Sequence, residues 1–313
     1  MTEYRQQHSD EWLQHFVRRG HHAPRPLAAG VEGAVYWLED GIVAKVWSGR
    51  APADLDLTGQ VYADIARYPL PFATPEILDV EEREGLTITY ERELAGSPMR
   101  SDDGAPQDAE LPSPEADALL TVLRGLSSVP GTEAMRRLTV QGDDRPLWQG
   151  HTRFPDALAA LVQRAVRRHS DLLAAHVSDL AHAVDWTVKS LRNLSDSPIT
   201  AVHGDLVPPN IHVGDDGRPT ALLDFGFFTT AGDPAFEAAV TAAVWDMYGP
   251  HAEAHTAALT RLFATELGHS RETMAVYQAA YALATYDLFA SDGSDGHFPW
   301  SVALLNRARA QGR

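Results

Sequence analysis

Three polar side chains at the ends of two apolar runs have the types and spacing for phosphate chemistry. The run 199–202 ends at His203-Gly204-Asp205, and Asn210 follows five residues after Asp205. Beyond the turn signal 215–217, Asp-Asp-Gly, a second apolar run ends at Asp224. Because a hairpin brings the ends of its two strands together, we expect Asp205, Asn210 and Asp224 to lie at one edge.

Each of these side chains has a role that phosphoryl transfer requires. Asp205 would orient an attacking hydroxyl and accept its proton, and the Asn210 amide oxygen and the Asp224 carboxylate are suitable Mg²⁺ ligands. We expect His203 to brace the loop through hydrogen bonds rather than to transfer a proton. The order and spacing match the catalytic and metal-binding loops of kinases and favour them over a chance hairpin with acidic turns. The pattern therefore predicts a phosphotransferase that uses ATP and Mg²⁺.

The strings His-Gly-Asp-Leu-x-Pro-x-Asn, Leu-Asp-Phe-Gly and, at 232–234, Gly-Asp-Pro resemble the aminoglycoside phosphotransferase family of small-molecule kinases. Gly204 stands where protein kinases carry Arg and points away from them. Val207 and Pro209 replace the His or Cys and the Gly that family members often have, and Glu237 is the nearest acidic residue where they usually have Asp. These departures leave the three chemical groups in place and concern the substrate class.

The resemblance implies an α+β, two-lobed protein-kinase-like fold. Residues 1–95 would form a nucleotide-binding N-lobe, a small antiparallel sheet plus a helix. Residues 96–313 would form a mostly helical C-lobe with the catalytic hairpin and the acceptor site. The hydrophobic pattern predicts a helix at 9–19 that packs on the first lobe, and an apolar helix at 270–290 central to the second.

Two features of the first lobe fit a nucleotide site. Gly30 and Gly33 form a Gly-x-x-Gly turn that would let the backbone approach phosphates, although a plain hairpin explains it equally well. Lys45 lies inside the apolar strand 42–47, where a charged amine needs a partner such as the α- and β-phosphates of ATP. The alternative for Lys45 is the solvent face of an edge strand.

Kinase-like folds pair this lysine with a carboxylate on the next helix, which we predict at 57–68. The family spacing points to Gln60, which is not acidic. Asp56 and Asp64 lie one turn to either side; we prefer Asp64, with a Gln60 hydrogen bond as the alternative.

A hinge that binds adenine through main-chain groups is expected at 91–96. Glu91 and Glu93 mark the positions of those contacts. The acidic, proline-rich segment 97–114 reads as a surface loop.

Other polar side chains of the second lobe have weaker signals. Asp287, Asp292 and Asp295 could hold substrate amines, and ordinary turn chemistry explains them equally well. Asp233 is expected to be a helix N-cap, with a place in the active site as the alternative. Surface positions are expected for two groups, the histidine pair His251 and His255 and the basic cluster Arg164, Arg167 and Arg168.

The composition limits the partners. With 43 acidic and 26 basic side chains the net charge is −17, which disfavours nucleic acid and anionic membranes and is compatible with a cationic substrate. The chain has no cysteine, which excludes disulfides and thiolate chemistry. It has no signal-peptide layout and no run long enough to span a bilayer, so we expect a cytoplasmic protein.

Three functions remain open. The resemblance favours a kinase that phosphorylates a hydroxyl of an aminoglycoside-type or other polyhydroxylated amine antibiotic, and so confers resistance. A metabolic kinase for a sugar, an amino alcohol or an amino acid hydroxyl is the alternative. A nucleotide-binding protein without catalysis is the third, and the complete set Asp205, Asn210 and Asp224 argues against it.

Overall fold

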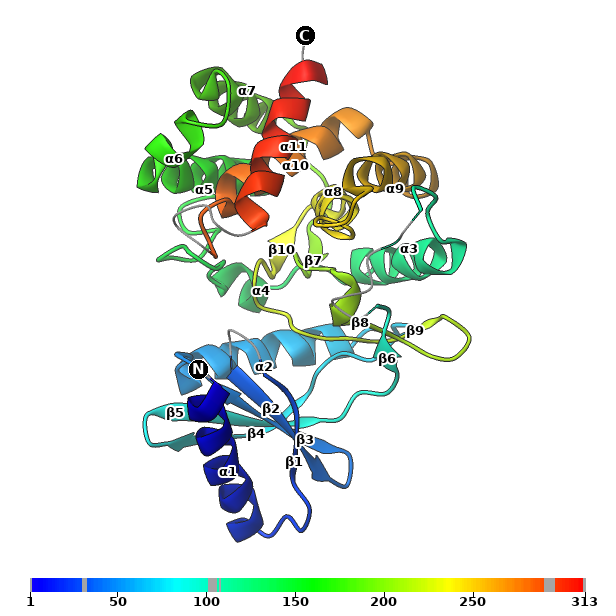
Figure 1. Cartoon of the computed structure of the whole chain (residues 1–313). Coiled ribbons are helices and arrows are strands. Elements are labelled where there is room, and N and C mark those ends of the chain that lie inside the picture. Colours follow the sequence, from blue (N-terminus) through cyan, green and yellow to red (C-terminus); the bar gives the residue numbers. More distant parts are fainter. Residues whose placement is uncertain (1, 30–32, 101–105, 107, 290–295, 312–313) are drawn as a thin grey trace. The chain divides into compact units, whose positions relative to one another are not determined.

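The chain forms two compact units, each described here by itself (Figure 1). Unit 1 comprises Met1–Arg67 and Ala73–Ala95, and unit 2 comprises Tyr68–Phe72 and Gly96–Arg313. The computed structural model describes all residues except 1, 30–32, 101–105, 107, 290–295 and 312–313. No helix in the described parts of the chain has the length and apolar character to cross a membrane.

Unit 1 is built on a five-stranded antiparallel sheet with the strand order β1-β2-β3-β5-β4. The strands are β1 (Arg25–Ala29), β2 (Gly33–Glu39), β3 (Ile42–Trp47), β4 (Ile77–Arg83) and β5 (Leu86–Arg92). Both tight hairpins turn at an acidic residue followed by glycine, Asp40-Gly41 and Glu84-Gly85, and all four residues have positive φ angles. Such turns match the twist of the flanking strands, so short-range sequence fixes both hairpins.

The core of unit 1 lies between one face of this sheet and helix α1 (Thr2–Arg18). Alternate residues of the strands, among them Ala44, Val46 and Ile88, pack around Phe16, which is fully buried. Lys45, between Ala44 and Val46, therefore points to the opposite face of the sheet. The predicted packing of the N-terminal helix is confirmed.

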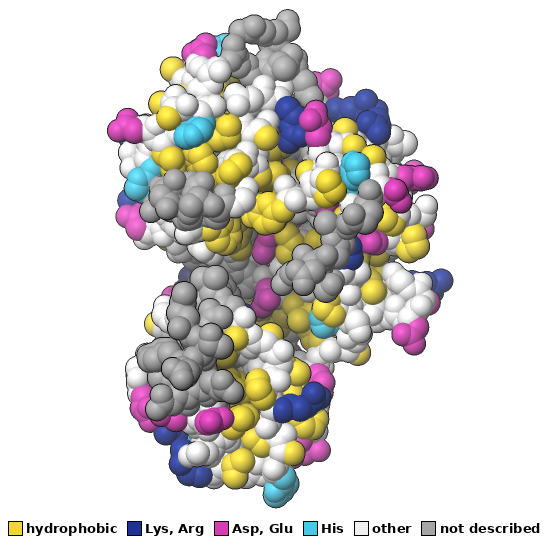
Figure 2. Space-filling view, viewed as in Figure 1, with side chains coloured by type: hydrophobic (Ala, Val, Ile, Leu, Met, Phe, Trp, Pro, Cys, Tyr) yellow, Lys and Arg dark blue, Asp and Glu magenta, His cyan; other side chains and the backbone are white. Residues whose placement is uncertain are grey.

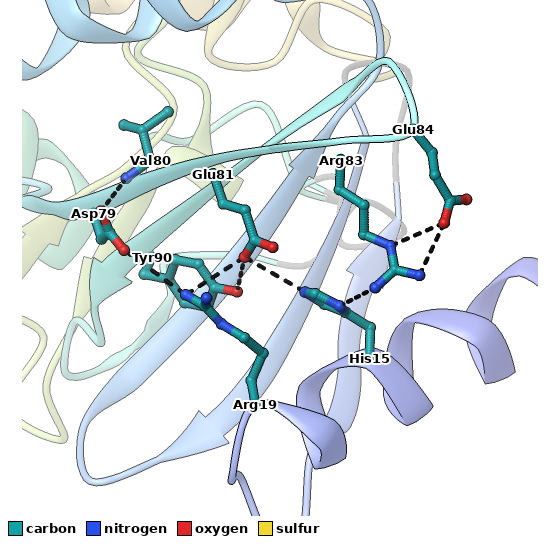
Figure 3. A network of polar contacts seen from close by, with 8 residues as sticks. All are labelled: His15, Arg19, Asp79, Val80, Glu81, Arg83, Glu84 and Tyr90. Carbon is teal, nitrogen blue, oxygen red and sulfur yellow. Dashed lines mark hydrogen bonds and ion pairs between the residues drawn. The ribbon is translucent and has the colours of Figure 1, made fainter.

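A polar network also holds α1 on the sheet (Figure 3). Glu81 accepts a 2.7 Å hydrogen bond from the Tyr90 hydroxyl, forms an ion pair of 3.5 Å with Arg19, and lies 3.5 Å from the Nε2 of His15. Arg83 contacts the other ring nitrogen of His15. Burial lowers the pKa of His15 and raises the pKa of Tyr90.

Helix α2 (Pro52–Ala66) begins five residues before the predicted start at 57. Pro52 occupies the first turn, where its missing N–H costs nothing, and the Asp54 carboxylate accepts the main-chain N–H of Ala51 at 3.4 Å. The helix therefore begins at these N-terminal signals, ahead of the predicted start.

Unit 2 is mostly helical, with short strands in two small sheets (Figure 1). Its helices are α3 (Ser113–Ser127), α4 (Glu133–Arg137), α5 (Phe154–Arg168), α6 (Ser170–Ala174), α7 (Leu180–Asn193), η1 (Pro208–Asn210), α8 (Pro234–Val244), α9 (Ala252–Leu267), α10 (Arg271–Thr285) and α11 (His297–Gln311). Its strands are β6 (Ser97–Pro98), β7 (Thr200–Val202), β8 (Ile211–Val213), β9 (Pro219–Leu222) and β10 (Thr230–Gly232), and they form the sheets β10-β7 and β6-β8-β9.

Helices α8 and α10 form the centre of unit 2. Every residue of α8 from Ala235 to Val244 is buried, and α10 packs against α5, α7, α8, α9 and α11. The prediction of a central apolar helix at 270–290 is confirmed, with its end at Thr285. The fold class predicted from the sequence, a small antiparallel sheet unit plus a helical unit of kinase-like type, is also confirmed.

Three local expectations for unit 2 were wrong. The apolar pattern of residues 155–176 predicts a single helix, but the structure divides it at His169, whose φ and ψ of −140° and 46° are not helical. Part of the predicted loop 97–114 is strand β6, which pairs with β8. His255 is buried, and its ring bonds to the Asp246 carboxylate at 2.6 Å, so α9 is not simply a surface helix.

Candidate active site

The hairpin β8–β9 brings Asn210 and Asp224 to the same end of two paired strands. Ile211 is opposite Leu222, and the main-chain N–H of Leu223 donates to the carbonyl of Asn210 at 2.9 Å. Asn210 therefore directly precedes the paired residues, and Asp224 is the second residue after them.

The side chain of Asn210 is oriented by Asp205. Its Nδ2 donates to the main-chain carbonyl of Asp205 at 2.9 Å and to the Asp205 Oδ2 at 3.2 Å. Since the amide nitrogen is engaged on this side, the amide oxygen is the atom directed away from Asp205. That oxygen is the part of Asn210 that can act as a metal ligand.

Asp224 has an exposed side chain and a φ of +53°. Positive φ is uncommon for a residue with a Cβ and concentrates at functional sites, although Asp and Asn tolerate it better than most. The described residues contain no group of three or more His, Cys, Asp or Glu side chains that could hold a metal. A metal here would thus depend on the Asn210 amide oxygen as well as on carboxylates, and these oxygen ligands suit Mg²⁺.

His203 is fully buried beside the three candidate residues. Its Nε2 lies 2.7 Å from the Leu223 carbonyl, and its Nδ1 accepts the main-chain N–H of Asp205 at 3.2 Å. The ring therefore carries its proton on Nε2, where the carbonyl accepts it. Burial lowers the pKa of His203 to about 4, so the neutral ring connects the Asp205 loop to the strand that precedes Asp224.

Glu237, on the buried helix α8, holds the main chain of the same loop. Its carboxylate accepts the N–H of His203 at 2.5 Å and that of Gly204 at 3.1 and 3.2 Å. Burial raises the pKa of Glu237 to about 8, against the two N–H donors, which lower it. Sequence reasoning gave Glu237 no role, although its place three residues after Gly-Asp-Pro was a usable signal.

Gly204 is required by the backbone at this point. Its φ is +76°, and a Cβ there would lie 2.6 Å from the Cβ and the carbonyl oxygen of Phe228. The chain can therefore pass close to Phe228 only if residue 204 has no side chain.

Asp233 is the N-cap of α8, as predicted. Its Oδ1 accepts the N–H of Ala235 at 2.8 Å, and its Oδ2 accepts the buried hydroxyl of Tyr277 at 2.8 Å. This bond joins α10 to the start of the helix that carries Glu237.

In unit 1, Lys45 lies in β3 between Val35 of β2 and Thr89 of β5, so it is not on an edge strand. Its ammonium group stands 4.0 Å from the centre of the Trp47 ring, a cation–π contact. The chain has two lysines, and the other, Lys189, forms an exposed ion pair with Asp185 on α7.

Asp64, the partner predicted for Lys45, forms an ion pair with Arg67. The two side chains are 3.0 Å apart, and Arg67 directly follows the last residue of α2.

The predicted glycine turn has a structural role at Gly33. Gly33 has a φ of +148°, and a Cβ there would lie 1.9 Å from the Val46 carbonyl oxygen, so this glycine permits close pairing of β2 and β3. Gly30 lies outside the described residues.

The expected hinge positions belong largely to the sheet. Glu91 is paired with Val43 on one side and Ile77 on the other. The main-chain N–H of Glu93 donates to the Gly41 carbonyl at 2.7 Å, and its carboxylate accepts the Trp37 indole N–H at 3.1 Å. An adenine contact through the N–H of Glu93 would have to replace the bond to Gly41.

Asp287, predicted as a possible ligand for a substrate amine, already has a cationic partner in the structure. Its side chain is 3 % exposed and forms a 3.3 Å ion pair with Arg168, with His169 at 3.9 Å. Arg164 pairs in the same way with Asp143, whose side chain is 3 % exposed, while Arg167 and Arg168 are exposed as predicted. Asp292 and Asp295 lie outside the described residues.

Comparisons with solved structures agree with this architecture. The GDP complex of aminoglycoside 2'-phosphotransferase-IIIa has 16 % sequence identity and a TM-score of 0.62, with 94 % of each chain covered. The macrolide 2'-phosphotransferase MphH from Brachybacterium faecium has 19 % identity and a TM-score of 0.62, with 95 % of this chain and 98 % of that one covered. The ADP-bound aminoglycoside phosphotransferase APH(2'')-Ib has 14 % identity and a TM-score of 0.57, with 96 % and 98 % covered.

At these identities the likeness to solved structures shows the fold alone. A search of curated protein sequences finds no match. The model of the phosphotransferase enzyme family matches residues 23–276, which include both the Lys45 strand and the whole catalytic hairpin. The chain therefore belongs to the phosphotransferase enzyme family.

Proposed function

We propose that the protein transfers the γ-phosphoryl group of a nucleoside triphosphate to a hydroxyl of a small molecule. The observation that carries this proposal is the contact between Asn210 and Asp205, which orients an amide oxygen for a cation beside a carboxylate suited to an acceptor hydroxyl. Asp224, exposed at the end of the paired strand, would complete the cation site.

Each residue of the proposed site has a defined part in this reaction. Asp205 orients the acceptor hydroxyl and takes its proton as the oxygen–phosphorus bond forms. Asn210 and Asp224 hold Mg²⁺, which when bound offsets the negative charge of the triphosphate oxygens. Lys45 binds the α- and β-phosphates. His203 and Glu237 keep the loop in place and exchange no proton with the substrates.

The donor we propose is ATP. Solved relatives are complexes with ADP and with GDP, so the family fold accommodates both purines. ATP and GTP are therefore both included as donors in the test.

The first acceptor class is a polyhydroxylated amine of the aminoglycoside type. It is supported by the family, by the aminoglycoside phosphotransferases among the structural relatives, and by the net charge of −17. The ion pair between Asp287 and Arg168 weakens the specific role predicted for Asp287, because a substrate amine would have to displace a guanidinium group.

A second acceptor class is favoured by aromatic side chains near the metal-binding loop. Phe227, three residues after Asp224, stacks on Phe289 with ring centres 5.7 Å apart and an interplanar angle of 6°. Phe289 is 53 % exposed, so this pair offers an apolar surface. An antibiotic with an apolar ring face, as in the substrates of a macrolide phosphotransferase, would suit it better than a polyamine.

The test is nucleoside diphosphate release with ATP or GTP and a panel of acceptors: kanamycin, gentamicin, erythromycin and a neutral hexose. We expect acceptor-dependent release with at least one antibiotic and a mass gain of one phosphate on it. A Phe289→Ala variant should lose activity on erythromycin selectively if the second class is correct. Acceptor-independent hydrolysis alone, or no release with any acceptor, would contradict the proposed reaction.

A further inference from the structure

A cavity of about 250 Å³, partly open to solvent, lies between three helices of unit 2. Among the described residues, its walls come from α9, α10 and α11, and none from the catalytic hairpin. The α9 residues that line it, Glu253, Thr256, Thr260 and Arg261 among them, recur at helical spacing on one face. The cavity is therefore a feature of helix packing, separate from the candidate active site.

Three arginines from the three helices line this cavity. Arg261 comes from α9, Arg271 from α10 and Arg307 from α11. Glu253 is the only acidic side chain among the described lining residues, so the lining carries a formal charge of +2 in a chain whose net charge is −17. In Figure 2, Lys or Arg side chains stand beside an acidic side chain over the part of unit 2 where Figure 1 places α9 and α11.

The guanidinium groups of this cavity are only weakly engaged. Arg261 and Arg271 are exposed, and within the described residues their side chains form no hydrogen bond and no ion pair within 4 Å; the neighbouring Glu272 interacts with Arg271 only through its charge. Arg307 is paired with Glu253 at 3.7 Å, and Glu253 is 79 % exposed. An exposed pair at this distance contributes little and can be exchanged for a better anion.

Neutral donors lie beside the charges. The Gln278 Nε2 donates to the Thr260 hydroxyl at 3.2 Å, so the hydroxyl hydrogen of Thr260 remains available to a ligand. Ala275, Ala279 and Leu304 supply an apolar part of the wall. The combination of several guanidinium donors, a hydroxyl and an apolar wall suits a phosphate group with a small organic body.

We propose that this cavity between α9, α10 and α11 binds a small phosphate monoester, with Arg261, Arg271 and Arg307 on the phosphate. The volume is below the usual range for drug-sized ligands, which limits the organic part to a few carbon atoms. The ligand would join three helices, and α10 is bonded to α8 through Tyr277 and through Gln278, which donates to the Ala239 carbonyl.

Calorimetric titration of the full-length protein with glycerol 1-phosphate and with inorganic phosphate, at constant ionic strength, tests this inference. We expect one saturable site for the ester, and weaker binding of inorganic phosphate because it lacks the organic part that contacts the rest of the lining, including Thr256 and Thr260. Arg261→Gln and Arg271→Gln should each weaken binding by about tenfold or more, since each removes a charge-assisted hydrogen bond. Arg167→Gln, an equal charge change at an exposed position of α5, should leave binding unchanged.

Two further variants make the result decisive. Glu253→Gln should strengthen binding, because the phosphate then has no carboxylate competing for Arg307. Asp224→Asn should bind the ester like the wild type, which separates this cavity from the candidate active site. Absence of saturable binding of both probes would overturn the inference. Equal affinity in the wild type, Arg261→Gln and Arg271→Gln would overturn it as well.

Discussion

Glu237 accepts the main-chain N–H of Gly204 with both oxygens of its buried carboxylate, at 3.1 and 3.2 Å. The same carboxylate also accepts the N–H of His203. A single side chain from α8 thus satisfies two successive backbone donors directly before Asp205. An unpaired buried donor is costly, so the position of Asp205 depends on a residue more than thirty positions away.

The first prediction concerns this carboxylate. Glu237→Ala removes both acceptor oxygens and leaves the N–H groups of His203 and Gly204 without this partner. We expect a loss of about 1–3 kcal/mol in the free energy of unfolding and a lower kcat. Urea unfolding and steady-state kinetics measure both. Glu266→Ala on α9, which removes an exposed ion pair with Arg124 of α3, is the control and should stay within about 0.5 kcal/mol of wild type. Equal stability of the two variants would contradict the bracing role.

The second prediction concerns Asp224. Asp224→Asn removes the charge that would bind Mg²⁺ and keeps a side chain that tolerates the left-handed backbone at φ +53°. We therefore expect a melting temperature close to that of the wild type and a large rise in the Mg²⁺ concentration needed for half-maximal turnover. Wild-type turnover at ordinary Mg²⁺ concentrations would remove Asp224 from the metal site.

The third prediction concerns pH. The folded-state pKa of His203 is about 4, below the usual 6.5, so the unfolded chain binds the extra proton between these values. The stabilisation from neutral His203 is complete above pH 6.5 and is lost, at about 1.4 kcal/mol per pH unit, as pH falls towards 4. Glu237 has the opposite dependence between about 4.5 and 8, because its folded pKa of about 8 is raised.

His203→Asn isolates the histidine contribution. The variant keeps the Glu237 dependence but lacks the ring that titrates. We expect the stability difference between wild type and His203→Asn to shrink steadily from pH 6.5 to pH 4. Chemical unfolding at four or five pH values measures it, and a difference that stays constant across this range would show that His203 is not held neutral by burial.

The candidate catalytic hairpin could be predicted because the residues that form it are close together in the sequence. Asp205, Asn210 and Asp224 are placed by one loop, one turn and two short strands, all within about twenty residues. The two acidic-residue–glycine hairpins of unit 1 are local for the same reason. Apolar periodicity likewise predicted α1 and α10, since a helix shows its buried stripe in its own sequence.

Contacts between distant segments could not be predicted in this way. The carboxylates of Asp246 and Asp287 have their partners on other elements, the His255 ring on α9 and the Arg168 guanidinium on α5. In the sequence, Glu237 is only the acidic residue nearest to the position where family members usually have Asp. Its role depends on the N–H groups of His203 and Gly204, which directly follow β7. Such pairings depend on tertiary packing, which leaves no periodic pattern along the chain.

The fourth prediction concerns Lys45, with the other lysine of the chain as its control. Lys45→Met keeps the length of the side chain against Trp47 but removes the charge, so we expect a higher KM for ATP with little change in stability. Lys189→Met, which removes only an exposed pair with Asp185, should leave KM unchanged. Equal KM values for the two variants would place the triphosphate away from Lys45.

The most direct measurement of the proposed chemistry is kcat for Asp205→Ala, together with its melting temperature and ATP affinity. Asn210 keeps its bond to the main-chain carbonyl of residue 205, so the loop and the nucleotide affinity should persist. The lost general base should lower kcat about a hundredfold to ten-thousandfold. A stable, ATP-binding Asp205→Ala variant with near-normal kcat would contradict the assignment of Asp205 as the group that accepts the hydroxyl proton.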